Sequence, residues 1–246
     1  MKRVIVLLAL GFFFSQTLAQ GQNRVYVFDN NGTVWDRGQS VQADAQTGLD
    51  PACLDVPSRD ARNITDHIDG YPFLVSGWGA GRIFTNEQIL SCEKINFFLH
   101  NRQMWVKMDG DVHSLEPHES IQAVEIGEKR LVAKVVQKYG DTPCWVEELE
   151  AGPYASVYKY YTSNYTPAIP PRNSYDTGNK ASFINKGYLY VSIEDGALQE
   201  LPEKTTAFLN LFPQHTAEMK QFLSQNKIKL NKEADVIKTI AYYNSL

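Results

Sequence analysis

The chain has 246 residues, of which 43% are hydrophobic and 12% aromatic. This composition excludes disordered, collagen-like and mucin-like proteins, and it supplies enough apolar surface for a folded core. With 28 acidic and 24 basic residues, the net charge is -4. The chain therefore lacks the basic excess that is typical of nucleic-acid-binding proteins.

The first nineteen residues have the pattern of a cleaved secretory signal peptide. Lys2 and Arg3 form a positive start, an apolar run covers 4–14, and small residues lead up to Ala19. The apolar run is shorter than the roughly 20 residues that a membrane-spanning helix needs. Gln20 follows the expected cut, where a lipoprotein carries cysteine. We expect a periplasmic or secreted protein that is cut after Ala19 and is not inserted in the membrane afterwards.

Export makes disulfide bonds possible, and three cysteines follow the expected cut, namely Cys53, Cys92 and Cys144. Three cysteines allow at most one bridge within the chain, and their spacing fits no zinc motif. The pair that we favour is Cys53 with Cys92, which would tie the N-terminal part to the sheet. The other pairings stay open.

Alternating apolar residues and turn signals predict a chain built of hairpins. The strongest signals are Asn31-Gly32, Asp109-Gly110 and Asp195-Gly196, each of which lies between two apolar segments. Further strands are expected at 82–85, 95–100, 121–126, 131–136 and 144–149. Segments 39–62 and 165–180 are rich in Pro, Gly and polar residues, so we expect loops there. Short strands without intervening helices favour an antiparallel sheet over a parallel nucleotide-binding fold.

Residues 201–246 change to helical periodicity. Pro202 suits the first turn of a helix that Pro213 ends, a second helix frays near Asn226, and Asn231 is expected to cap a third. The buried stripe of the third helix is expected to comprise Val236, Ile237, Ile240 and Ala241. Helices this short gain stability by docking, so we place them against the sheet.

The predicted fold class is α+β and mainly β. It consists of an antiparallel curved sheet or partial barrel, built of hairpins, with a C-terminal cap of two to three short helices. We divide the chain into a signal peptide at 1–19, a leader of one hairpin and loops at 20–62, and a β-rich domain at 63–246 that includes the helices.

Several segments in this domain share a recognisable order. They are IDGYPFL at 68–74, GRIFT at 81–85, INFFLHN at 95–101, WVK at 105–107 and the closing AYYNSL at 241–246. Together they span roughly three quarters of the chain, and they resemble a widespread uncharacterised family of secreted proteins of Gram-negative bacteria. The resemblance implies export and a β-rich body with C-terminal helices. Because the family has no established activity, the resemblance implies no catalytic residues.

Three motifs that suggest chemistry have structural explanations. The glycine-rich segment 77–81 lacks the spacing of a dinucleotide fingerprint and is expected to be a turn that opens a strand. Ser76 does not lie in a nucleophile elbow. Asp109-Gly110-Asp111 with His113 resembles a cation loop only loosely, and a hairpin turn already explains it. We therefore expect no catalytic, cofactor-binding or metal-binding residues and no cofactor.

Tyrosines are concentrated between residues 154 and 165, at Tyr154, Tyr158, Tyr160, Tyr161 and Tyr165. In a strand the first three share one face and the last two share the other. Such rows commonly pack as cross-strand pairs, but tyrosine also suits interfaces, so both uses stay open. The partner-binding candidates are Tyr154, Tyr158, Tyr160, Tyr165 and Trp78.

The functional expectation is a non-catalytic module that binds a protein or glycan of the cell envelope and no nucleic acid. The alternative is an unrecognised secreted hydrolase with its site in the concave face of the sheet. A convergent cluster of acid, base and nucleophile would favour the hydrolase, whereas an exposed aromatic patch would favour the binding module.

Overall fold

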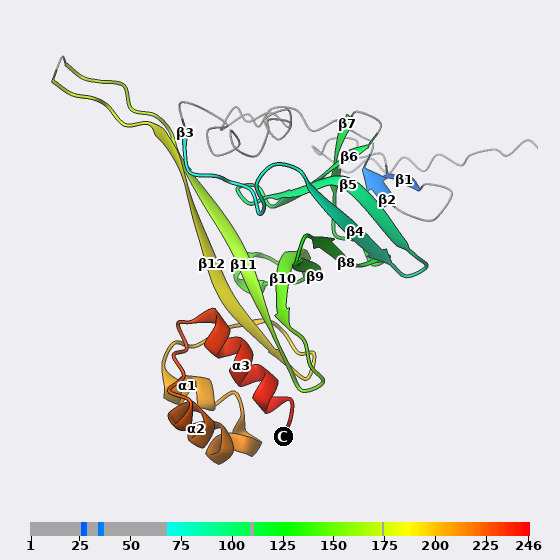
Figure 1. Ribbon diagram of the computed structural model, residues 1–246, viewed down its shortest axis with the longest axis vertical. Helices are drawn as coiled ribbons and strands as arrows, with labels where there is room; N and C mark the ends of the chain where they lie inside the picture. Colours follow the sequence, from blue (N-terminus) through cyan, green and yellow to red (C-terminus); the bar gives the residue numbers. More distant parts are fainter. Residues whose placement is uncertain (1–25, 29–33, 37–67, 109–110, 174) are drawn as a thin grey trace, which may run out of the picture.

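The computed structural model describes residues 26–28, 34–36, 68–108, 111–173 and 175–246. In these residues the chain is mainly β, with thirteen strands in one large mixed sheet that does not close and a few short helices at the C-terminus (Figure 1). The predicted α+β class with mainly β content is confirmed. The helices of this described part include none that is long and apolar enough to cross a membrane.

Most strands pair with a neighbour in sequence, as expected for a sheet built of hairpins. The strands are β1 (Tyr26–Phe28), β2 (Val34–Asp36), β3 (Ile68–Asp69), β4 (Gly79–Thr85), β5 (Ile89–Phe98), β6 (Gln103–Met108), β7 (Asp111–Leu115), β8 (Ile121–Ile126), β9 (Lys129–Lys134), β10 (Cys144–Glu150), β11 (Ala155–Thr166), β12 (Ala181–Ile193) and β13 (Gln199–Glu200). Their order across the sheet is β1-β2-β7-β6-β5-β4-β8-β9-β10-β11-β12-β13, while β3 pairs in parallel with the start of β12.

Strand β4 breaks the sequential order, because β5 and β8 pair with its two edges. The glycine-rich segment 77–81 turns at Gly77, where φ is 66°, and enters β4 at Gly79. Gly81 permits a close approach of β8, since a Cβ atom at this position would lie 2.3 Å from the Glu125 carbonyl oxygen. The predicted turn that opens a strand is thus confirmed.

The three predicted hairpins are present, with one correction. Strands β1 and β2 pair, as do β6 and β7, while the turn residues 31–32 and 109–110 lie outside the described residues. After β12 the positive φ angles fall on Glu194 (49°) and Asp195 (56°), one residue earlier than predicted. The Gly196 N–H donates to the Ile193 carbonyl oxygen at 2.8 Å, which closes the turn around those two residues.

Alternation along the strands divides the core between the two faces of the sheet. On one face, which we call the tyrosine face, Tyr158, Tyr160 and Tyr190 pack with valines of β9 and β10. On the opposite face, which we call the helix face, one cluster gathers around β4, β5 and β8, and a second lies between β11, β12 and the helices.

The helices α1 (Thr205–Leu209), α2 (Thr216–Gln225) and α3 (Glu233–Tyr243) pack on the base of β11 and β12 (Figure 1). Val236 and Ile240 of α3 are fully buried against Val157 and Val191 of the strands, so the predicted docking is confirmed.

Two details of the third helix were predicted wrongly. Its N-cap is Lys232 rather than Asn231, and Ala241 is exposed. Because the helix begins after Lys232, the buried stripe passes through Val236, Thr239 and Ile240. The Thr239 hydroxyl donates a hydrogen bond to the Asp235 carbonyl oxygen at 2.7 Å.

The closing Tyr-Tyr-Asn-Ser-Leu segment has a structural role. The side-chain oxygen of Asn244 accepts hydrogen bonds from the N–H groups of Tyr154 (3.1 Å) and Ala155 (2.9 Å), and its nitrogen donates to the Ala155 carbonyl (2.8 Å). The amide packs directly on Gly152, where a Cβ atom would lie 2.0 Å from it. Asn244 therefore ties the end of α3 to the start of β11.

Candidate functional site

The predicted tyrosine row is split between core and surface. Tyr158 and Tyr160 are each only 2% exposed, whereas Tyr154 is 51% exposed. Tyr165 is half-buried and packs against Phe183 with a ring-centroid distance of 5.0 Å. Because Tyr158 and Tyr160 are buried, a partner could contact them only after the core unpacked, and their role in binding stays a prediction.

Trp78, the remaining aromatic candidate, is half-buried beside β4 and packs with the cluster of Phe73, Phe98 and Trp105. Its indole Nε1 is buried and makes no hydrogen bond within the described residues. Trp78 therefore contributes mainly to packing.

Two segments far from β11 in sequence cover Tyr160 on the tyrosine face. Tyr139, in the 3₁₀ turn at 137–139, stacks on its ring with centroids 4.2 Å apart and planes 5° apart. Arg102, in the turn between β5 and β6, places its guanidinium carbon 5.1 Å from the centre of the Tyr160 ring, and its Nη1 donates to the phenol oxygen. Burial raises the pKa of Tyr160 to about 12, so its phenol stays neutral at physiological pH.

Arg102 adopts a backbone conformation that is unusual for a residue with a side chain. Its φ is 58°, in the left-handed region that glycine and asparagine occupy most readily. For a non-glycine residue this conformation costs on the order of 1–3 kcal/mol. The hydrogen bond and the ring contact with Tyr160 offset part of this cost and keep the guanidinium on the tyrosine face.

A second cation lies over Tyr158, the neighbouring tyrosine of the same face. Lys134, at the end of β9, places its ammonium 5.4 Å from the centre of the Tyr158 ring. Its cross-strand partner is Cys144, whose thiol lies 3.5 Å from the Lys134 carbonyl oxygen. The Arg102 guanidinium also faces this thiol and lowers its pKa, but desolvation outweighs it, so the pKa of Cys144 is raised. We call Arg102, Lys134, Cys144 and the two tyrosines Tyr158 and Tyr160 the Arg102–Lys134 patch.

The helix face carries a different polar cluster. The buried carboxylate of Glu147 on β10 accepts a hydrogen bond from Lys129 at 2.7 Å and another from the Tyr161 hydroxyl. Lys159 lies over the Tyr161 ring at 5.1 Å and reaches Glu233 of α3 at 2.7 Å. Burial, and then the hydrogen bond to Glu147, raises the pKa of Tyr161. The cluster therefore joins sheet and helix through satisfied charges, and its tyrosine is not an activated nucleophile.

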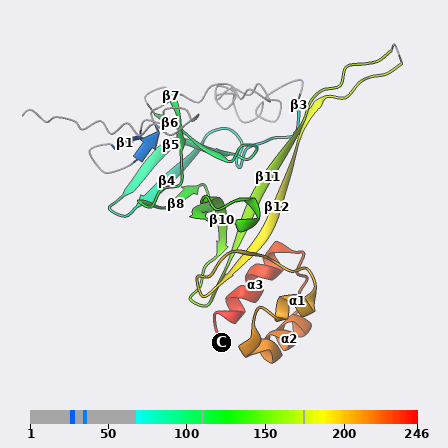
Figure 2. The ribbon, with the colours of Figure 1, turned by 180° about the vertical axis from the view of Figure 1, so that it is seen from behind.

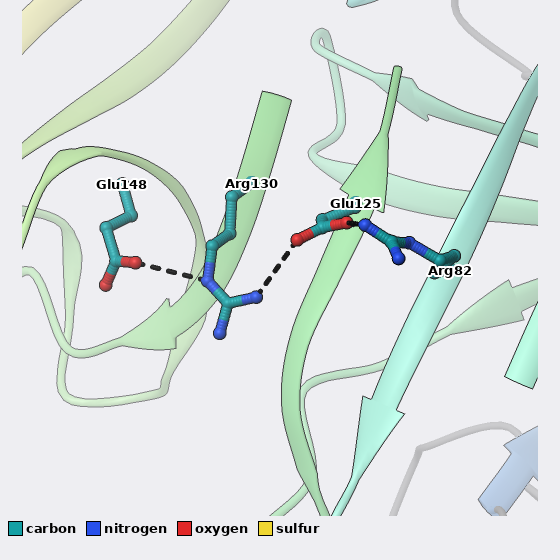
Figure 3. Close-up of polar contacts among 4 residues, drawn as sticks. All are labelled: Arg82, Glu125, Arg130 and Glu148. Atoms are coloured by element: carbon teal, nitrogen blue, oxygen red, sulfur yellow. Dashed lines mark hydrogen bonds and ion pairs between the residues drawn. The ribbon is translucent and has the colours of Figure 1, made fainter. Parts of the chain in front are cut away.

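A ladder of alternating charges crosses four strands on the tyrosine face (Figure 3). Glu125 binds Arg82 at 2.5 Å and Arg130 at 3.3 Å, and Arg130 also binds Glu148 at 3.2 Å. Each pair joins residues that lie opposite each other on adjacent strands. Because the arginines are well exposed, each ion pair stabilises the fold by at most about 1 kcal/mol.

Strands β11 and β12 continue beyond the rest of the sheet as a hairpin that we call the arm (Figures 1 and 2). Its end, which we call the arm tip, comprises residues 167–173 and 175–180. Backbone pairing of Ile169 with Asn179 (2.8 and 2.9 Å) extends the hairpin into the tip. In both views the tip projects away from the helices and the other strands.

Hydrogen bonds hold the arm tip in a defined turn. The Asn173 side chain accepts from the N–H of Tyr175 at 3.0 Å, and the Asp176 carboxylate accepts from the N–H of Gly178 at 2.9 Å. Hydrogen bonds from the backbone N–H groups of Gly178 and Arg172 lower the pKa of Asp176. The Tyr175 side chain is 98% exposed, and Ile169 (45%) and Ile184 (54%) are exposed below it.

The cysteines are partly accounted for. Cys92 and Cys144 form no disulfide with each other, and Cys53 lies outside the described residues, so the favoured pair of Cys53 with Cys92 stays a prediction. Burial raises the pKa of Cys92 to about 11. Within the described ranges, no three His, Cys, Asp or Glu side chains gather where they could hold a metal ion.

Sequence reasoning missed the residues that give the tyrosine face its charge and the arm its apolar tip. Arg102 meets Tyr160 across 58 positions of sequence, and no local pattern marks that contact. The arm tip was predicted only as an exposed loop. A single signal was present, because Tyr175 is an aromatic residue in a segment otherwise made of turn-forming residues.

No protein-family model matches this chain, and neither a curated protein nor a solved structure matches it. The resemblance to the secreted family therefore stays a prediction, as do the signal peptide and export.

Proposed function

We propose that this protein is an exported, non-catalytic binding module that contacts a protein of the cell envelope with its arm tip. The observation that carries the proposal is the fully exposed Tyr175 at the end of a projecting hairpin, with Ile169 and Ile184 exposed below it. Tyrosine combines a large apolar area with a polar end and loses little conformational entropy when it is fixed, which makes it a common anchor in interfaces.

The turn of the arm tip supports this use. Because Asn173 and Asp176 fix the backbone around Tyr175, binding does not have to order this segment first. The partner that fits is a protein with an apolar pocket wide enough for a phenol ring and a neighbouring surface that receives the isoleucines. Burial raises the pKa values of Cys92, Cys144 and Tyr161, so these three side chains are poor candidates for the nucleophile of a hydrolase.

Site-specific photo-crosslinking in cells tests this proposal. A photoreactive phenylalanine analogue is placed at Tyr175 and, as a matched control, at Lys220, which is exposed on α2 at the opposite end of the molecule. We expect one discrete adduct from position 175, none from position 220, and loss of the adduct when Ile169→Asp is added. Identical adducts from both positions, or no adduct from position 175, would refute the proposal.

A further inference from the structure

The Arg102–Lys134 patch has cations without matching anions. Arg102 and Lys134 are both half-buried, and neither forms an ion pair with a carboxylate of the described residues. Glu200, which lies on the same side of the molecule, is bound to Lys138 at 2.6 Å. Withdrawing cations from water without an opposite charge is unfavourable, so two such cations together form a preformed site for an anion.

The two cations flank one small area. Lys134 lies over Tyr158, Arg102 lies over Tyr160, and these tyrosines are two residues apart on the same face of β11. Cys144 contacts both residues, since its thiol lies 3.5 Å from the Lys134 carbonyl oxygen and hydrogen-bonds the Arg102 guanidinium. A single ligand group placed over Cys144 can therefore interact with both cations.

The geometry selects the kind of anion. A guanidinium has five N–H donors in one plane; Nη1 of Arg102 donates to the Tyr160 oxygen, and the guanidinium also hydrogen-bonds the Cys144 thiol. The remaining donors match the two oxygens of a carboxylate, which arginine binds more specifically than lysine does. Tyr139 adds an aromatic surface at the edge of the patch: one side of its ring covers Tyr160, the Lys138 ammonium lies 5.8 Å from the ring centre, and the residue stays 39% exposed.

We propose that the Arg102–Lys134 patch binds a small carboxylate ligand whose ring packs on the exposed side of Tyr139. The carboxylate lies over Cys144 between the two cations, and the ring of the ligand extends toward the 3₁₀ turn at 137–139. This site is separate from the arm tip and does not depend on the partner protein proposed above.

Titration with three probes tests the site. Calorimetry measures the binding, and the NMR chemical shifts of Tyr139 report where the probe binds. Glucuronate has a carboxylate and a ring, glucose has the ring without the carboxylate, and acetate has the carboxylate without the ring. We expect glucuronate to bind more tightly than either of the others and to shift the Tyr139 resonances. Undetectable glucuronate binding, or equal binding of glucose, would refute the anion site, and equal binding of acetate would refute the ring contact.

Two variants separate binding from folding. Arg102→Gly removes the guanidinium at a position whose φ of 58° suits glycine, and Lys134→Gln removes the second charge without shortening the side chain much. Each is expected to weaken glucuronate binding by at least about tenfold while the protein stays folded. The control is Arg82→Gln, whose arginine lies on the same face but is bound to Glu125, and it should leave binding unchanged. Unchanged affinity in both Arg102→Gly and Lys134→Gln would overturn the assignment.

Discussion

Asn244 shows how one side chain couples two parts of the molecule. Its amide makes three hydrogen bonds to the backbone of Tyr154 and Ala155 at the start of β11. The close fit requires glycine at position 152, where a Cβ atom would lie 2.0 Å from the amide nitrogen of Asn244. The segment that marks the end of the sequence is therefore explained by packing rather than by chemistry.

The first prediction concerns this contact. Asn244→Ala leaves the Ala155 N–H and carbonyl without their partner and should lower the free energy of unfolding by about 1–3 kcal/mol. Thermal unfolding of the variant and the wild type measures the loss. Ser245→Ala is the matched control, because the exposed Ser245 hydroxyl bonds only to the nearby Tyr242 carbonyl, and it should change stability by less than about 0.5 kcal/mol. Equal melting temperatures for the two variants would contradict the role given to Asn244.

The second prediction concerns alkaline pH. The pKa of Tyr160 is raised from 10.0 to about 12, first by burial. A raised pKa in the folded state gives a stability contribution that is complete below pH 10 and is lost as the pH rises toward 12, because the unfolded chain ionises first. Between these pH values Tyr160→Phe should therefore lose less stability than the wild type does.

Denaturant unfolding at pH 8, 10 and 11 provides the measurement. Tyr175→Phe is the control, since this tyrosine is 98% exposed and its substitution should leave the pH dependence as it is in the wild type. If the free energy of unfolding falls with pH equally in Tyr160→Phe and in the wild type, ionisation of Tyr160 does not contribute to the loss of stability.

At the scale of the element, α3 is held by the sheet rather than by its own sequence. It has no side-chain cap at its N-terminus, and a helix of eleven residues is marginal alone. Val236 and Ile240 are fully buried against β11 and β12, so apolar burial supplies the stability that the helix ends do not.

Ile240→Ala tests this dependence. Truncating a fully buried isoleucine costs about 2–5 kcal/mol, which should lower the melting temperature by at least several degrees. Ala241→Ser changes the adjacent, exposed position of the same helix and should have little effect. If both variants melt like the wild type, α3 is not docked in solution.

The elements that the sequence predicted well are those whose signal is local. Strand β8 was placed at its observed bounds from alternation alone, and the loop at 165–180 separates β11 and β12 as expected. The turn after β12 was placed one residue late, because pairing with β11 decides which residues adopt positive φ, and Glu194 accepts this conformation although glycine would suit it better. At such a position the strand register, rather than the conformational preference of the individual residue, decides where the turn forms.

The candidate sites were less predictable for the same reason. The tyrosine row was recognised, but whether Tyr158 and Tyr160 are covered depends on Tyr139 and Arg102, which come from two other turns. The Arg102–Lys134 patch exists only because β5, β9 and β11 meet in one sheet. Contacts of this kind require the fold to be known.

At the scale of the whole molecule, the two ends of the β11–β12 hairpin differ: one end packs in the core, and the other end exposes apolar side chains. The base of β11 and β12 is buried under the helices, while the other end carries Tyr175 and Ile169 beyond the rest of the sheet (Figure 2). The hydrogen bonds of the arm tip are made within the tip itself. The tip therefore adds little to the stability of the body, and its exposed apolar residues are better explained by a contact with a partner.

The last prediction tests this separation. Replacing residues 168–180 by Asn-Gly keeps the pairing register of β11 and β12 and closes it with a two-residue turn that suits a hairpin. Because the tip contributes no core residue, the melting temperature should change by less than about 4 °C, which corresponds to about 1 kcal/mol for a chain of this size. Gly127→Val, in the β8–β9 turn where φ is 60°, is the positive control and should lower the melting temperature, since a β-branched residue is strained there. A large loss of stability in the Asn-Gly variant would show that the tip supports the fold, and the projecting hairpin would then need a structural explanation in place of a binding one.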